Sequence, residues 1–156
     1  MLIKTGLINA LIDSFIYLFI FDFLNSRFEK RPHVRVWDSV SLNTLHIIGQ
    51  NGEFDKGISC LSFSKLDGGN LLCVVDESNE HMVSLWEWNK GSNGHRISES
   101  KSTCDPVLAV EFHPIEKYSL ITIGKGHIHF WDIEGGTLVK KIGSFEVSFS
   151  WFHQVQ

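Results

Sequence analysis

Three stretches of the chain repeat one pattern: HVRVWDSVSLNTLHIIG (33–49), MVSLWEWNKGSNGHRIS (82–98) and HIHFWDIEGGTLVKKIG (127–143). In each stretch, apolar residues on alternate positions lead up to a tryptophan, and an acidic residue follows that tryptophan. The three tryptophans, Trp37, Trp86 and Trp131, are 49 and 45 residues apart. A repeat of about 40–45 residues is the length of one four-stranded sheet in a repeat protein. The spacing therefore predicts a series of similar sheets.

The segments between the tryptophans supply the remaining strands. Residues 58–63 and 107–112 alternate apolar and polar side chains, which is typical of a strand with one buried face. Turn residues follow each of them, and a shorter apolar strand then leads toward each tryptophan strand. We therefore expect two complete four-stranded antiparallel units at about 58–98 and 107–143. The last two strands of another unit, at 33–49, precede them.

These repeats resemble WD40 repeats, and in particular the echinoderm microtubule-associated protein-like (EMAP-like) family. The runs that carry the resemblance are HVRVWDSVSLNTLHIIG, FDKGISCLSFSKLDGGNLLCVVDESNEHMVSLWEW and VLAVEFHPIEKYSLITIGKGHIHFWDIEGGTLVKKIG. The resemblance covers about residues 32–146 and implies an all-β fold: a partial WD40 β-propeller of about two and a half four-stranded blades. The fold-signature residues are Trp37, Asp38, Trp86, Trp131 and Asp132. A bulky aromatic on a half-buried strand suits sheet packing, so we expect the tryptophans to be core residues rather than a binding cage.

The resemblance also divides the chain and implies its function. We expect an apolar segment outside the family at 1–30, a propeller fragment at 31–146 and a non-family tail at 147–156. Membership implies a non-catalytic protein-interaction scaffold in the cytoplasm and at the cytoskeleton, with tubulin or microtubules as partners. One alternative is a generic WD40 adaptor for another complex, and another is a propeller fragment tethered to a membrane through residues 7–24.

The N-terminal segment is the least typical part of the chain. Residues 7–24 read LINALIDSFIYLFIFDFL, an apolar run for which we expect a helix. A membrane span needs about 20 largely apolar residues, and this run is shorter and carries Asp13 and Asp22. No small-residue cleavage site typical of a signal peptide follows it. A packed helix is the leading interpretation, and a membrane anchor stays open.

Composition and motifs argue against several functional classes. The net charge of −4 does not suit a nucleic-acid binder, which needs a basic face. The three cysteines form no CxxC pair, so we expect reduced thiols and no zinc site. No phosphate-binding loop, GxSxG elbow or HExxH motif occurs. His127 and His129 share a strand face but lack a third ligand at a defined spacing. We expect no enzymatic activity, no cofactor and no metal.

The acidic turn DESNE (76–80) is the candidate interaction loop, with Asp76, Glu77, Asn79 and Glu80 as the residues that would contact a partner. The alternative is an ordinary solvated turn. WD40 repeats often carry an aspartate six residues before the tryptophan. Glu80 and Lys125 stand at that position here, so we expect the associated hydrogen bonds to be rewired.

An incomplete propeller should leave sheet faces uncovered at its two ends. Exposing large apolar side chains costs about 1.5–3 kcal/mol each, against a net stability of about 5–15 kcal/mol. We therefore expect marginal stability or aggregation of the isolated chain. The alternative is that the apolar segments 7–24 and 145–152 cover the open faces.

Overall fold

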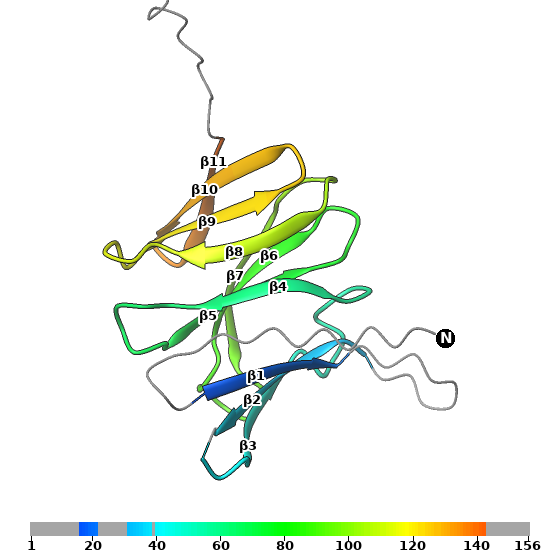
Figure 1. The fold of residues 1–156 in the computed structure, drawn as a ribbon, viewed down its shortest axis with the longest axis vertical. Coiled ribbons are helices and arrows are strands. Elements are labelled where there is room, and N and C mark those ends of the chain that lie inside the picture. The colour runs from blue at the N-terminus through cyan, green and yellow to red at the C-terminus, as the bar shows by residue number, and fades with distance from the viewer. Residues whose placement is uncertain (1–15, 22–30, 39, 143–156) are drawn as a thin grey trace, which may run out of the picture.

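The computed structural model describes residues 16–21, 31–38 and 40–142, and within these ranges the protein is all-β, without helices. In these ranges, eleven strands form three antiparallel sheets that follow one another along the chain (Figure 1). The first sheet contains β1 (Ile16–Phe21), β2 (His33–Asp38) and β3 (Thr44–Ile48). The second contains β4 (Ile58–Phe63), β5 (Leu71–Asp76), β6 (Met82–Glu87) and β7 (His95–Lys101). The third contains β8 (Val107–Phe112), β9 (Ser119–Gly124), β10 (His127–Glu134) and β11 (Thr137–Ile142).

The two four-stranded sheets match the predicted units, and neighbouring strands in each are also neighbours in sequence. Each sheet pairs its tryptophan strand in the same register: Leu72 lies opposite Trp86 and Leu120 lies opposite Trp131. Even the irregularities repeat. The first strand of each sheet shifts register near its start, between Ile58 and Cys60 in β4 and between Val107 and Ala109 in β8. The repeat in the sequence is therefore a repeat of backbone geometry.

The helix expected in the N-terminal segment is wrong for residues 16–21. They form β1, which pairs with β2 in antiparallel register and places Tyr17 opposite Trp37. A short apolar run cannot be assigned to helix or strand by periodicity, and its aromatic and β-branched residues favour a strand beside an available edge. The rest of 1–30 lies outside the described residues. In the described part of the chain, no helix has the length and apolar character needed to cross a membrane.

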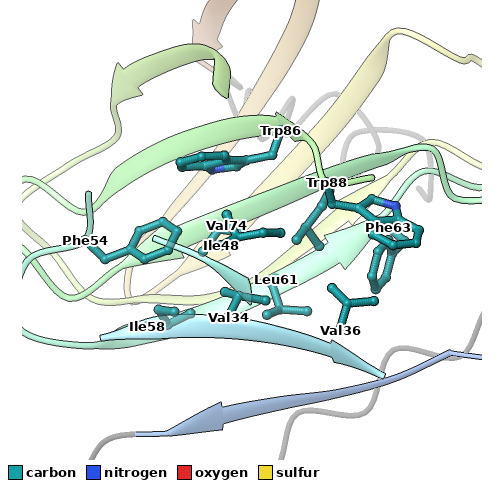
Figure 2. Packing of buried hydrophobic residues seen from close by; sticks show 11 residues of the cluster. Val34, Val36, Ile48, Phe54, Ile58, Leu61, Phe63, Val74, Trp86 and Trp88 are labelled. Carbon is teal, nitrogen blue, oxygen red and sulfur yellow. The ribbon is translucent and has the colours of Figure 1, made fainter. Parts of the chain in front are cut away.

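Two apolar cores join the three sheets. Between the first and second sheets, Val34, Val36, Ile48 and Phe54 pack with side chains of β4, β5 and β6, among them Trp86 (Figure 2). Between the second and third sheets, a separate cluster gathers residues of β4, β5, β6, β8, β9, β10 and β11 around Trp131. Because alternate residues of a strand point to opposite faces, the second sheet supplies one face to each core. It is the one sheet covered on both sides by described residues.

The packing between sheets is closest where β4 lies against β8, and β7 also contacts β11 (Figure 1). Several hydrogen bonds join the second and third sheets directly, and two of them mark the two sides of the contact. The Ser59 hydroxyl donates to the carbonyl of Val107 at 2.8 Å, and the amide of Leu138 donates to the Ser98 hydroxyl at 3.0 Å. The sheets are therefore fixed to one another at both the β4–β8 and the β7–β11 side.

Candidate interaction surface

The signature tryptophans of the two complete sheets lie in the cores. Trp86 is 2% exposed and Trp131 is fully buried. Their indole N–H groups are satisfied in different ways. The Nε1 of Trp131 donates to Thr122 Oγ1 on the neighbouring strand at 2.9 Å, whereas the Nε1 of Trp86 donates to Ser84 Oγ on its own strand, also at 2.9 Å. Each buried indole thus has a hydroxyl acceptor. In the third sheet the acceptor lies on β9, beside the tryptophan strand, and in the second sheet it lies on the tryptophan strand β6 itself.

The acidic residues after the tryptophans stabilise local structure. Asp38 Oδ1 accepts hydrogen bonds from the amides of Val40 and Ser41 at 3.1 and 2.7 Å, and the Ser41 contacts hold the pKa of its carboxyl below the ordinary value. Asp132 accepts hydrogen bonds from Lys141 and from the Ser119 hydroxyl, and these lower the pKa of its carboxyl. The Asp38 contacts close the turn after β2, and the Asp132 contacts join β10 to β9 and to β11. Trp37, the remaining signature residue, is half-buried on β2.

The acidic turn between β5 and β6 contains one structural residue and several exposed ones. Asp76 is 4% exposed, and its carboxylate accepts hydrogen bonds from the amides of Asp55, Ser78 and Met82 at 3.3, 3.0 and 2.9 Å. A side chain held this way positions the turn and is not available to a partner. Glu77, Asn79 and Glu80 are exposed. The structure thus separates Asp76 from the three other residues predicted to form the interaction loop.

Backbone and side-chain contacts tie this turn to both neighbouring connections. The Glu77 amide donates to the carbonyl of Gly57 at 2.8 Å, and the amides of Ser102 and Thr103 both donate to the carbonyl of Glu80 at 3.1 Å. The Lys56 ammonium group donates a hydrogen bond to Asn79 Oδ1, and Lys101 Nζ forms an ion pair with Glu80 Oε2 at 2.7 Å. Residues 49–57, 77–81 and 102–106 therefore form one connected surface at one end of the sheets, which we call the acidic rim.

The acidic rim presents carboxylates to solvent. Asp55, Glu77 and Asp105 are exposed, and no described basic side chain lies within ion-pair distance of any of the three. Glu80, in contrast, is neutralised by Lys101. Because Asp76 and the two connections hold the backbone in place, the exposed carboxylates are displayed on a fixed frame. Such a surface can bind a complementary basic or hydrogen-bonding surface of another macromolecule.

A second surface is the outer face of the third sheet, which no described element covers (Figure 1). We call it the open face and define it by Leu108, Ile121, Ile123, Ile128 and Phe130. Leu108, Ile123 and Phe130 are 68%, 42% and 48% exposed. Sequence reasoning expected an uncovered face at each end of the stack but did not identify these residues. The available signal was the second set of apolar residues, alternating with the buried set along β9 and β10.

The open face continues into a hollow of about 450 Å³ lined by β8, β9, β10 and the turn after β8. An ion pair between Lys65 and Glu111, at 2.9 Å, forms part of its wall. Phe130 belongs to its lining as well. The surface therefore combines a shallow apolar area with charged groups that already neutralise each other.

The titratable groups in the cores do not assemble a reactive or metal-binding centre within the described ranges. No three His, Cys, Asp or Glu residues there are close enough to hold a metal ion. Cys60 and Cys73 are buried, and burial raises the pKa of the Cys60 thiol to about 11; Cys104 is exposed. His127 and His129 stack with ring centroids 4.8 Å apart. Burial, with Lys140 and His127 nearby, lowers the pKa of His129.

Comparison with known proteins places this arrangement in a family. A family model for the first β-propeller of echinoderm microtubule-associated proteins matches residues 23–151. The chain belongs to this family. It is 56% identical over 118 residues to the 77 kDa echinoderm microtubule-associated protein of Lytechinus variegatus. It is 55% identical over 115 residues to echinoderm microtubule-associated protein-like 2 of Mus musculus, and 53% identical over 115 residues to echinoderm microtubule-associated protein-like 4 of Homo sapiens.

Within the EMAP family, this chain corresponds to a short part of each relative. These alignments cover 74–76% of the chain but only 11–17% of the relatives. The predicted resemblance to the family and the partial β-propeller are thus confirmed, and strands β2 to β11 lie within the match to the first propeller. β1 ends at Phe21, before the family match begins at residue 23. The domain limits at 31 and 146 stay predictions.

Proposed function

We propose that this chain serves as a non-catalytic piece of an interaction scaffold in a microtubule-associated protein of the cytoplasm and cytoskeleton, with tubulin or another protein as its partner. The observation that carries the proposal is the stack of blades that the family model of the first EMAP propeller matches, with 55–56% identity to two relatives. The relatives are named as microtubule-associated proteins. Blades fixed to each other by packed cores can display loops to a partner without any reacting group.

The acidic rim is the surface through which we propose that the scaffold contacts its partner. Its exposed carboxylates at Asp55, Glu77 and Asp105 come from three different connections and are held on one frame by backbone hydrogen bonds. A preorganised charged surface contributes mainly to specificity and to the rate of association. Asp76 would act indirectly by holding the turn, whereas Glu77 would face the partner. Asn79 and Glu80 would support the turn through Lys56 and Lys101.

A segment exchange tests the proposed role. Residues 32–146 of this chain would replace the matching segment of mouse echinoderm microtubule-associated protein-like 2, and co-sedimentation with microtubules would be measured. If the parent relative pellets with microtubules, the chimera should do so too, because the exchanged segments are 55% identical. A folded chimera that stays in the supernatant would contradict the proposal. This chain alone should pellet poorly, since a partner surface formed by a whole propeller is larger than the part present here.

The rim can be tested in the same chimera. Reversing charge at Asp55, Glu77 and Asp105 should reduce the pelleted fraction and weaken its dependence on salt. The matched control reverses Glu116 and Glu134, which are exposed at the opposite end of the sheets. Equal binding by the rim and control variants would exclude the acidic rim as the contact, while leaving the scaffold role to be judged by the exchange itself.

A further inference from the structure

We propose that the edge of β2 is a strand-binding site and that residues 16–21 are an intramolecular ligand occupying it. The ligand class is an extended apolar segment of six residues that pairs antiparallel with β2. β1 takes the place of the second strand of a blade, but it is held as a bound peptide is held, along one edge. An equivalent segment supplied as a separate peptide can therefore replace it.

The first argument is that β1 occupies a defined position on β2. In both four-stranded sheets the tryptophan strand lies between two neighbours, β6 between β5 and β7 and β10 between β9 and β11. The second strand of each of these sheets places a leucine opposite the tryptophan. β1 places Tyr17 opposite Trp37 in the same antiparallel direction, and its register continues from Ile16 to Phe21. The edge of β2 therefore accepts a strand in one register.

The second argument is the origin of the strand that fills this position. The family match begins at residue 23, whereas β1 ends at Phe21. Residues 77–81 join β5 to β6 and residues 125–126 join β9 to β10, but the longer segment 22–32 separates β1 from β2. When a strand is added to a sheet edge, main-chain hydrogen bonds supply the affinity, so the sequence of the added strand can vary. A segment from outside the family match can therefore fill the position.

The third argument is that β1 is held on one side only among the described strands. β5 lies between β4 and β6, and β9 lies between β8 and β10, whereas β1 is the outermost strand of its sheet and pairs with β2 alone (Figure 1). An edge strand separates when one ladder of hydrogen bonds breaks, while an inner strand has to break two. β2 also pairs with β3, and its Val34 and Val36 belong to the apolar core. The acceptor edge can therefore outlast the departure of β1.

The apolar core sets the chemistry of the ligand. Val34 and Val36 are fully buried in that core. The register places Ile20 opposite Val34 and Leu18 opposite Val36. Because paired strands alternate between the two faces of a sheet in step, positions 18 and 20 belong to the core face and Phe19 to the other face. We expect a ligand to need apolar residues at alternate positions and to tolerate polar residues between them.

The covalent connection keeps the site filled in the intact chain. A segment joined through a connection as short as residues 22–32 is supplied at an effective concentration on the order of millimolar. A free peptide that makes the same contacts competes poorly against this advantage. Cutting the connection removes the advantage and turns the pairing of β1 with β2 into an ordinary bimolecular equilibrium.

A cleavable form of the full chain tests the proposal. A protease recognition site would be inserted between residues 22 and 32 of the 156-residue chain and cut after folding. The two pieces should co-elute in size-exclusion chromatography, because the backbone pairing persists after the cut. A fluorescein-labelled peptide of residues 13–24, with a lysine tail for solubility, should then exchange with the N-terminal piece and gain fluorescence anisotropy. The uncut chain should bind this peptide far more weakly.

Two matched peptide variants test the register and the face. Ile20→Asp puts a charge on the core face and should weaken binding by about tenfold or more. Phe19→Asp puts the same charge on the other face, one residue away, and should weaken binding by no more than about twofold. Equal weakening by both variants would contradict pairing in this register.

Hydrogen exchange of the backbone amides shows whether the peptide fills the site. Release of the N-terminal piece should speed exchange in β2 and leave β5 and β9 protected, and added peptide should restore protection in β2. Released body that keeps β2 protected, or loses protection in β5 and β9 as well, would overturn the proposal. So would a cut chain that binds no peptide even in urea below its unfolding midpoint, because residues 16–21 would then be a fixed part of the sheet. Equal binding by the cut and uncut chains would place the peptide elsewhere.

Discussion

In both complete sheets, the buried tryptophan donates its indole N–H to a hydroxyl group, but the residue that carries this hydroxyl lies on a different strand in each sheet. Thr122 lies opposite His129 in the third sheet, and Val74 lies opposite Ser84 in the second. The hydroxyl therefore moves from the neighbouring strand in one sheet to the tryptophan strand in the other. A buried indole N–H without an acceptor is costly, so either arrangement suffices but one must be present.

Removing these hydroxyls tests this explanation. Thr122→Val keeps the shape of the side chain but leaves Trp131 Nε1 without its acceptor, and we expect a loss of about 1–3 kcal/mol in the free energy of unfolding. Thr122→Ser, which keeps a hydroxyl, should lose less. In the second sheet, Ser84→Ala should be destabilising, and adding Val74→Thr should recover part of the loss. Urea unfolding monitored by tryptophan fluorescence measures each variant. A Val74→Thr change that gives no recovery would contradict the proposed equivalence.

His129 gives the fold a pH dependence near neutrality. Burial lowers its pKa below the ordinary value of 6.5, and the nearby Lys140 and His127 lower it further. The unfolded chain therefore binds a proton on this side chain more readily than the folded one. The free energy of unfolding should be fully retained above pH about 6.5 and should decrease as the pH falls below that value.

Substitution identifies the source of this pH dependence. His129→Gln should flatten the decrease in unfolding free energy below pH about 6.5, whereas His95→Gln, at an exposed residue, should not. Chemical unfolding at a series of pH values provides the measurement. Asp38 and Asp132 affect the free energy of unfolding in a separate, more acidic pH range. Their carboxyl pKa values are lowered, so their contribution is lost only when the pH falls below the ordinary range of a carboxyl group. An unchanged profile in the His129 variant would rule out this residue as the source.

At the scale of elements, the turn between β5 and β6 depends on one buried carboxylate. Asp76 accepts hydrogen bonds from amides on both sides of the turn and from the connection before β4. It therefore links two strands of one sheet to the segment that joins the first and second sheets. A carboxylate in this role is part of the fold, although its sequence context is that of an exposed acidic loop.

Asp76→Ala should lower the free energy of unfolding by about 1–3 kcal/mol, because the buried amides lose their acceptor. Asp76→Asn keeps one oxygen acceptor and should fall between the parent and the alanine variant. Glu77→Ala, at the adjacent exposed residue, should leave the melting temperature unchanged. Differential scanning calorimetry compares the three. A melting temperature lowered as much by Glu77→Ala as by Asp76→Ala would show that the turn is held by other contacts.

At the scale of the whole molecule, the second sheet is the best-covered part of the protein. Its two faces supply both apolar cores, while the third sheet supplies one face to a core and leaves the other open. Stability in repeat proteins is the sum of each unit and its contacts with its neighbours. Substitutions at equivalent positions should therefore have very different effects in the two sheets.

Leu85 and Phe130 provide a matched pair. Leu85→Ala should lower the free energy of unfolding by about 2–5 kcal/mol, since the residue is fully buried and leaves a cavity. Phe130→Ala should change it by no more than about 0.5 kcal/mol, since the residue is 48% exposed and no described sheet packs against it. Urea unfolding at low protein concentration makes the comparison. Similar losses in both variants would mean that the open face is covered within a single copy.

The sequence by itself determined the repeat. The tryptophan spacing and the alternation of residues in 58–63 and 107–112 are local patterns, and strand formation, strand order and the family all follow from them. Local patterns could not decide the state of the apolar residues 16–21, because a short apolar run fits a helix or a strand until an edge such as β2 is beside it. The helix predicted for residues 16–21 was therefore wrong.

Only the tertiary structure decided which charged and apolar residues are exposed. Asp76 and Glu77 are adjacent acids in the sequence, but the amides that bury Asp76 belong partly to a segment 21 residues away. Leu85 and Phe130 occupy one position of the repeat, but only Leu85 has another sheet against it. Burial depends on what distant segments place against a residue. A periodic pattern records which face of a strand is apolar, and the neighbouring sheet determines whether that face becomes core or surface.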